Sequence, residues 1–194
     1  MFHKTLRLPL VAGLLAVALA LVACGSDAAD TNTAEYEVVT PAVLTPGDAI
    51  PAPAGDVILT LSGDISVTNS GETLKLDMAT IEQLGLVQYT VEDPWAEANV
   101  TYTGVLMSDI KKYAGMSSAA TSIQMTALDD FSVEISVADI DRWPIMLATR
   151  TNGDYMDIEN AGPTRIIFPY HTGTFDLETY NKFWIWNLKS MDVS

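Results

Sequence analysis

The sequence predicts an α+β domain that is mostly β, because short strand-like runs clearly outnumber helix-like ones. Apolar and polar residues alternate in several of these runs, as they do in half-buried strands. Turn signals rich in Gly, Asn, Asp and Ser separate the runs. A few short stretches begin with helix-capping residues, and they account for the α component.

The first half of the domain is expected to alternate between strands and two short helices. Asp77 is placed to cap the first helix, which Gly85 closes, and Ser108 to cap the second, which stops at Gly115. The expected elements, in order, are strands around 57–61 and 74–76, a helix at 78–84, a strand around 100–105 and a helix at 109–114.

The second half has the clearest strand periods. Phe131, Val133, Ile135 and Val137 alternate with polar residues after the turn at 128–130, which predicts a hairpin with residues 123–127. The further expected strands are buried runs at 145–148 and 166–168, separated by the turn at Asn152-Gly153, and a last strand at 184–188 in which Trp184, Trp186 and Leu188 alternate.

The N-terminus predicts export and lipid attachment. A positively charged start precedes an apolar run that is too short to span a bilayer comfortably. Residues 21–24, Leu-Val-Ala-Cys, resemble a lipobox, so we expect Cys24 to carry lipid; a plain signal peptide or an anchor helix are the alternatives. We therefore expect a signal peptide at 1–23, a proline-rich flexible tether at 24–54 and one domain at 55–194, held on the periplasmic or extracellular face of the cell envelope.

The charge of the chain limits its partners. Without residues 1–23 the chain has 8 basic and 25 acidic residues, a formal net charge of −17. Such a charge repels nucleic acid and anionic lipid headgroups, so no nucleic acid partner is expected. A role in solubility alone would also explain the negative charge.

Read in order, several segments resemble the sulfite-oxidase-type molybdopterin-binding family in its small bacterial form. This resemblance implies mixed, barrel-like sheets with a few short helices over most of residues 56–193. No single segment is specific, but their order and spacing together carry the likeness. The segments are Leu61-Ser62-Gly63, Tyr102-Thr103-Gly104-Val105-Leu106, residues 126–133, 144–148 and 162–169, and Trp184-Ile185-Trp186-Asn187-Leu188.

The chain also departs from that family at residues that matter for chemistry. The family's molybdenum-binding cysteine precedes the Tyr102-Thr103-Gly104 element, and here that segment, residues 89–95, has none. A soft thiolate cannot be replaced by Thr or Asp without changing the metal chemistry, so the molybdenum cofactor is not expected. The family's pterin-contacting His-Gly-x-Pro-x-Arg is reduced here to residues 160–165, Asn-Ala-Gly-Pro-Thr-Arg, which keep the arginine, Arg165, but not the histidine. The family's Lys-Trp pair is displaced to Lys182-Phe183-Trp184.

The resemblance implies a pterin-type ligand, and some cysteine-free relatives are sensors that act on a membrane signalling protein. Pterin recognition needs aromatic faces for stacking and polar groups for the ring edge. The candidate ligand-binding residues are Trp95, Asp130, Arg165, Tyr170, His171 and Trp184. No metal site and no catalytic residue is expected, since His171 is the only histidine after residue 23 and no nucleophile motif accompanies it.

Structural roles compete with several of these assignments. Alternating tryptophans in a final strand usually fill a core, which is the favoured interpretation of Trp186. Asp129 fits a turn residue, and Arg165 could pair with a buried acid for structural reasons. Three hypotheses stay open: a lipid-anchored pterin-binding regulator of a membrane signalling partner, a subunit of a molybdopterin-dependent oxidoreductase, and a protein-interaction domain with a vestigial pocket.

Overall fold

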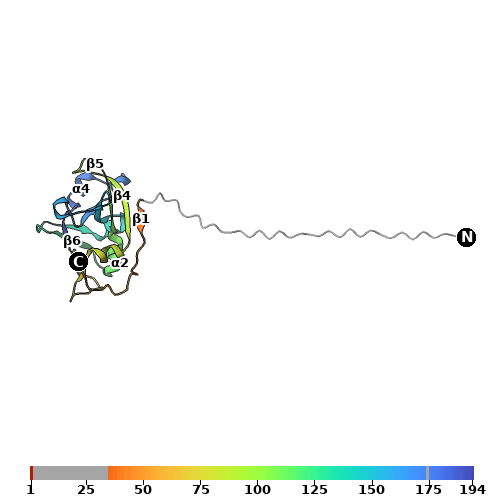
Figure 1. Ribbon diagram of the computed structural model, residues 1–194, viewed down its shortest axis with the longest axis horizontal. Coiled ribbons are helices and arrows are strands. Elements are labelled where there is room, and N and C mark those ends of the chain that lie inside the picture. Colours follow the sequence, from red (N-terminus) through yellow and green to blue (C-terminus); the bar gives the residue numbers. More distant parts are fainter. Residues whose placement is uncertain (2–34, 174) are drawn as a thin grey trace. The chain divides into compact units, whose positions relative to one another are not determined.

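The computed structural model describes residue 1, residues 35–173 and residues 175–194 (Figure 1). The expected lipidation site Cys24, and the signal peptide and tether up to residue 34 apart from Met1, lie outside the described residues. Among the residues that are described, no helix is both long and apolar enough to cross a membrane.

Two β-sheets form the described part of the domain, which confirms the mostly β class. The sheets are open and separate rather than closed into a barrel. In the described residues, the six-stranded sheet has the order β1-β4-β5-β8-β10, with β9 paired to β8, and the five-stranded sheet has the order β3-β2-β11-β6-β7. Every neighbouring pair is antiparallel except β11 and β2. One hydrophobic core includes residues from both sheets.

The strands have the following bounds. The first sheet contains β1 (Glu37–Thr40), β4 (Leu86–Asp93), β5 (Ala98–Leu106), β8 (Met146–Thr151), β9 (Asp154–Tyr155) and β10 (Arg165–Ile167). The second contains β2 (Leu59–Gly63), β3 (Leu74–Leu76), β6 (Ser122–Ala127), β7 (Ser132–Ser136) and β11 (Leu188–Val193).

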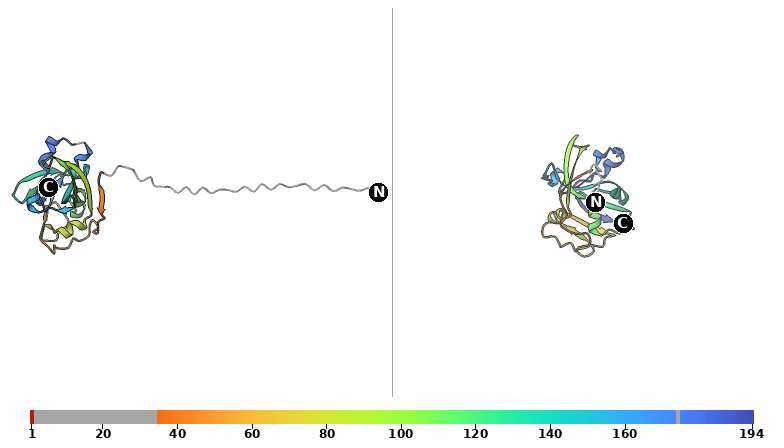
Figure 2. Two further views of the ribbon diagram at one scale, coloured as in Figure 1. Left: turned by 45° about the horizontal axis from the view of Figure 1, so that its top comes forward. Right: turned by 90° about the vertical axis from the view of Figure 1, so that its right-hand side faces the viewer.

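The hairpin of β4 and β5 is the longest pairing in the first sheet, and β4 was not expected from the sequence. Seven residue pairs connect the two strands, from Val87 opposite Gly104 to Asp93 opposite Ala98. Its far end lies at the same end of the domain as the segment around α4, which is blue in Figures 1 and 2. This end of the domain holds the site described below.

The close approach of β5 to β8 explains why glycine occupies position 104 in the Tyr102-Thr103-Gly104 element. A Cβ atom at this position would lie 2.1 Å from the carbonyl oxygen of Leu147 and 2.6 Å from the Cα atom of Ala148. The register between β5 and β8 shifts at this point. Only glycine therefore lets the two backbones approach this closely.

The four α-helices of the described residues are short, and three single-turn 3₁₀ helices accompany them. Asp77 caps the first as expected, accepting a hydrogen bond from Thr80 N. The second begins two residues earlier than expected, and the third was missed because Ser136 caps it directly after β7. The helices are α1 (Met78–Gln83), α2 (Met107–Ala114), α3 (Val137–Arg142) and α4 (Leu177–Tyr180), with η1 (Ile158–Asn160), η2 (Tyr170–Thr172) and η3 (Asn181–Phe183).

Part of the segment expected to be a flexible tether belongs to the domain. Residues 37–40 form β1, the edge strand that pairs with β4. The carbonyl oxygen of Glu35 contacts His171 Nε2 at 2.7 Å, and that of Leu44 accepts a hydrogen bond from the Tyr113 hydroxyl. Ile50 is buried in the core. Composition did not reveal these contacts because β1 pairs through backbone groups and leaves its side chains exposed.

The last strand starts later than its alternating tryptophans indicated. Trp184 and Ile185 are both buried, so burial does not alternate here. Asn187 then takes a left-handed conformation with φ of 49° and donates hydrogen bonds to the carbonyl oxygens of Ile158 and Gly162. This turn interrupts the extended backbone, and β11 begins at the next residue, Leu188.

Candidate ligand-binding site

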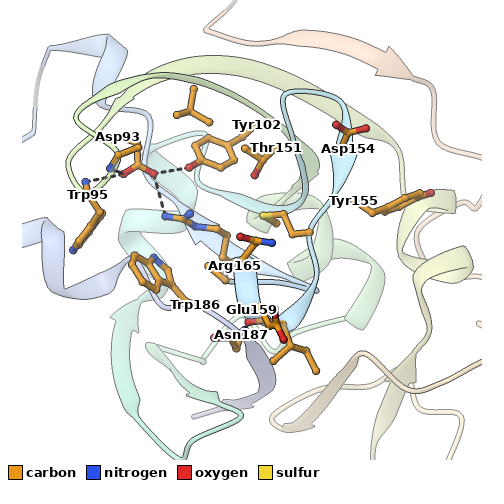
Figure 3. A pocket seen from close by; sticks show the side chains of 16 residues that line it. Asp93, Trp95, Tyr102, Thr151, Asp154, Tyr155, Glu159, Arg165, Trp186 and Asn187 are labelled. Atoms are coloured by element: carbon orange, nitrogen blue, oxygen red, sulfur yellow. Dashed lines mark hydrogen bonds and ion pairs between the residues drawn. The ribbon is translucent and has the colours of Figure 1, made fainter.

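Three residues from three strands meet at one end of the first sheet. Asp93 ends β4, Tyr102 lies on β5 and Arg165 begins β10. The Tyr102 hydroxyl donates to Asp93 Oδ2 at 2.5 Å, and Arg165 Nη2 lies 3.2 Å from the same oxygen. Figure 3 shows these contacts as dashed lines. All three side chains are buried, so a charged pair is held inside the fold.

The carboxylate of Asp93 is fully engaged. Its second oxygen, Oδ1, accepts hydrogen bonds from the backbone N–H groups of Trp95 and Ala96 at 2.7 and 2.9 Å. Burial opposes ionisation, but the hydrogen bonds from Tyr102 and these two N–H groups, with the charge of Arg165, hold the pKa of Asp93 below its ordinary value. Asp93 therefore serves as a charged anchor and leaves little lone-pair capacity for a further partner.

Arg165 combines burial with an unsatisfied donor. Its guanidinium lies 5.2 Å from the ring centre of Tyr102, 5.6 Å from that of Trp184 and 5.1 Å from that of Trp186. Burial lowers the pKa of Arg165, and the charge of Asp93 only partly offsets this. Its Nε has no hydrogen-bond partner among the described residues. A buried donor without a partner costs about 1–3 kcal/mol, so the surroundings of Arg165 favour a further hydrogen-bond acceptor.

A cleft of about 580 Å³ opens over this cluster (Figure 3). Its volume is in the usual range for small-molecule sites. Aromatic, apolar and polar side chains surround it, and they come from β4, β5 and the turn between them, from β8, β9, η1 and β10, and from the loop before β11. The lining residues are Asp93, Trp95, Ala96, Val100, Tyr102, Thr151, Asp154, Tyr155, Met156, Ile158, Glu159, Asn160, Ala161, Arg165, Trp186 and Asn187.

A smaller cavity of about 330 Å³ adjoins the cleft. Trp95, Trp186 and Asn187 line both spaces, and the two indoles meet edge to face with ring centres 5.7 Å apart. Trp184 and Lys182 line only the smaller one. The pair Trp95–Trp186 therefore forms a shared aromatic wall.

The structure brings three of the six predicted site residues to these two spaces. Trp95 and Arg165 line the cleft, and Trp184 lines the smaller cavity, with its ring centre 5.3 Å from that of Trp95 and the two planes tilted. Trp184 is 4% exposed and Trp186 is 38% exposed. The expectation that Trp186 fills the core is therefore wrong, because the Asn187 turn directs this segment away from a regular strand.

The other three predicted residues line neither space. Asp130 takes a turn conformation with φ of 68°, and its exposed carboxylate pairs with Lys189 Nζ at 2.5 Å. Tyr170 packs behind Trp184, with ring centres 5.1 Å apart. His171 is exposed and lies against Tyr89 and the Glu35 carbonyl. Turn geometry accounts for the position of Asp130, packing against Trp184 for that of Tyr170, and the segment just before β1 for that of His171.

Asp93, Tyr102 and Trp186 are the site residues that sequence reasoning missed. A signal for Asp93 was present: Val87, Tyr89, Val91 and Asp93 share one buried face of β4. A carboxylate that continues an apolar alternation needs a buried partner. That partner is Arg165, which lies between apolar strand residues in the same way.

The donor groups of the described residues do not fit a molybdenum centre bound by a protein thiolate. The chain's one cysteine is Cys24, far from the cleft in sequence. Within residues 89–95 the buried carboxylate is that of Asp93, which is already bound by four donors. No cluster of three or more His, Cys, Asp or Glu side chains suited to a metal occurs in the described part of the chain. A soft metal would find no protein ligand of matching softness here.

Comparisons with known proteins agree with this fold. The sequence profile of the oxidoreductase molybdopterin binding domain matches residues 68–187. Among solved structures, the sulfane dehydrogenase SoxCD from Paracoccus pantotrophus is similar, with a TM-score of 0.54 and 14% identity over 70% of this chain. The match covers 37% of the SoxCD chain, so this protein corresponds to a part of it. No curated protein is significantly similar in sequence.

Proposed function

Because the chain belongs to the oxidoreductase molybdopterin binding domain family, we propose that its cleft binds a pterin-type heterocycle without a protein-bound molybdenum. The observation that carries this proposal is Arg165, a residue of the cleft lining whose buried Nε has no hydrogen-bond partner among the described residues. A ring nitrogen or carbonyl oxygen of a pterin would satisfy that donor.

The aromatic wall supplies the second requirement of such a ligand. The half-exposed indoles of Trp95 and Trp186 offer faces for stacking a flat ring. Amide and carboxylate groups of Asn160, Asn187 and Glu159 line the same cleft and can accept hydrogen bonds from an amino group. Binding needs no movement of Asp93, whose contacts hold Arg165 in place.

The finer role we propose is regulation of a membrane signalling partner from a lipid anchor. It rests on the expected lipidation of Cys24 and on the absence of a thiolate donor at residues 89–95, which suits recognition better than redox catalysis. Ligand binding at the cleft would then change a surface that the partner contacts.

Isothermal titration calorimetry of the mature protein with a small set of oxidised and reduced pterins tests the binding. Trp186→Ala should weaken binding roughly tenfold, since stacking and burial of one ring contribute on the order of 1–2 kcal/mol. Leu177→Ala, an exposed apolar residue outside both spaces, is the matched control and should leave affinity unchanged. If the wild type binds none of the pterins, the proposal fails and an interaction domain with a vestigial pocket takes its place.

A molybdopterin-dependent oxidoreductase subunit is the second candidate, and family membership and the fold shared with SoxCD favour it. Elemental analysis separates the two. Protein produced in a host that makes the cofactor should contain no stoichiometric molybdenum under the first proposal. A molybdenum content near one atom per chain would favour the second.

A further inference from the structure

We propose that the cleft discriminates against heterocycles that carry a phosphate, and that Asp154 and Glu159 are the residues that determine this specificity. The inference rests on the proposed pterin binding and deepens it by naming the class of ligand: an uncharged or cationic heterocycle with a neutral side chain.

The charges that line the cleft are unequal. Its lining contains three carboxylates, those of Asp93, Asp154 and Glu159, and one cation, Arg165. Arg165 and Asp93 neutralise each other through their ion pair. The carboxylates of Asp154 and Glu159 remain, and neither belongs to an ion pair within residues 35–173 and 175–194.

Both carboxylates belong to short elements that contribute to the lining of the cleft. Asp154 begins β9 and pairs with Thr151 of β8, another lining residue. Glu159 lies in η1, which Asp157 caps. Both residues are exposed, and Figure 3 shows them at separate places around Arg165. A phosphate held near either place would lie close to an uncompensated carboxylate.

Nearby cations do not offset this charge. Arg150 stacks on Tyr155 beside the cleft, but its guanidinium is already paired with Glu82 at 2.5 Å. Lys189 is paired with Asp130. Lys182 lines the smaller cavity and not the cleft. A phosphate in the cleft would therefore face Arg165, whose charge is shared with Asp93, and two uncompensated carboxylates.

Electrostatics sets the size of the expected effect. Two exposed carboxylates repel a phosphate dianion within about 10 Å, which is the distance over which 0.1 M salt screens charges. The repulsion should therefore be clear at low ionic strength and smaller at high ionic strength. We expect roughly a fivefold to tenfold preference for the uncharged ligand in dilute buffer.

Calorimetry with neopterin and neopterin monophosphate tests the inference, because the two probes share one heterocycle and differ by one phosphate. In dilute buffer the monophosphate should bind at least about fivefold more weakly than neopterin, and added salt should narrow the gap. The double variant Asp154→Asn/Glu159→Gln should remove most of the gap by raising affinity for the monophosphate.

The control is Glu72→Gln/Glu134→Gln, which removes the same net charge from exposed residues outside the cleft lining. It should leave the preference intact. If the wild type binds the monophosphate as tightly as neopterin or more tightly, the inference is overturned while the proposed pterin binding stands. If Lys182→Gln then loses binding of the monophosphate, the phosphate lies in the smaller cavity. If the control variant also loses the preference for neopterin, the inference is overturned as well. If neither probe binds, the proposed function fails, and the inference with it.

Discussion

Tyr102 and Arg165 share one oxygen atom, Oδ2 of Asp93, which accepts from the hydroxyl at 2.5 Å and lies 3.2 Å from the guanidinium. The Tyr102 ring also lies under the guanidinium, 5.2 Å from it. Tyr102 therefore supports the buried ion pair twice, through a hydrogen bond and through its aromatic face.

Replacing Tyr102 with Phe should separate these two contributions. Tyr102→Phe keeps the ring but removes one donor from a buried carboxylate, so we expect a loss of about 1.5–3 kcal/mol in the free energy of unfolding. Urea denaturation at neutral pH measures it. A double-mutant cycle with Asp93→Asn should show that the two changes are strongly non-additive; additive effects would mean that the hydroxyl acts elsewhere.

The same tyrosine makes the free energy of unfolding depend on pH in the alkaline range. Burial, with the nearby carboxylate of Asp93, raises the pKa of Tyr102 above its ordinary value of about 10. The folded state thus holds this proton more tightly than the unfolded state. Its contribution is fully present below about pH 10 and is lost as pH rises further. Thermal melts between about pH 8 and pH 11 should show a steeper decline in the wild type than in Tyr102→Phe.

The two C-terminal tryptophans should respond differently to truncation. Trp184 is 4% exposed, so Trp184→Ala should destabilise the domain by about 3–5 kcal/mol through cavity formation. Trp186 is 38% exposed, so Trp186→Ala should cost within about 1 kcal/mol while weakening ligand binding. Melts and calorimetry on both variants check this. A reversed order of stability loss would contradict the buried position of Trp184.

Ionised Asp77 should stabilise the folded state at neutral pH, and this contribution should be lost when acid protonates the carboxylate. Thr80 donates to Asp77 Oδ1 through its hydroxyl and its N–H, and Ala54 and Gly55 N–H groups donate to Oδ2. The Thr80 hydroxyl bond first, then these backbone bonds, lower the pKa of Asp77 from 3.8 to about 2. Because the folded pKa is depressed, this stability is present above about pH 4 and is lost as pH falls to about 2.

Variants at this position test the assignment. Asp77→Ala should lower the free energy of unfolding at pH 7 by about 1–2 kcal/mol, whereas Asp77→Asn, which still caps a helix, should lose less. Denaturant titrations at about pH 7 and pH 2 should show wild type and Asp77→Asn converging in acid. A gap of equal size at both pH values would argue against ionised Asp77 as the source.

Lipid attachment at Cys24 is a prediction from sequence alone. The wild type should be found in the membrane fraction with a lipid-modified N-terminal cysteine by mass spectrometry. Cys24→Ser should be left uncleaved or soluble, and globomycin should block processing of the wild type. A mature protein without lipid, or processing that ignores globomycin, would contradict the lipobox.

The pattern of apolar residues was enough to predict the mostly β fold and most of its buried strands, since side-chain alternation reports burial directly. It failed where backbone conformation decides the outcome. β1 is held by backbone pairing with exposed side chains, and the positive φ of Asn187 ends the expected strand of Trp184 and Trp186. Neither leaves a hydrophobic period in the sequence.

The site was predictable in part for a similar reason. Arg165 and Trp95 could be picked from the family resemblance, but the partner that orients Arg165 is Asp93, 72 residues earlier in the chain. A pairing over such a distance depends on strand order, which the alternation of residues does not encode. Asp130, Tyr170 and His171 have suitable chemistry, yet the turn and packing around each direct them elsewhere.

The pairing of β1 with β4 limits the length of chain between the expected lipidation site and the domain. If Cys24 carries lipid, only residues 24–34 separate the anchor from the domain, and a fully extended chain of that length reaches roughly 40 Å. A tether running to residue 54 would reach roughly 100 Å. If the lipid is attached, the shorter tether would keep the domain close to the bilayer, and this would raise its effective concentration toward a partner in the same membrane. The domain could then contact a partner surface far above the membrane only if β1 first separated from β4 and lengthened the tether.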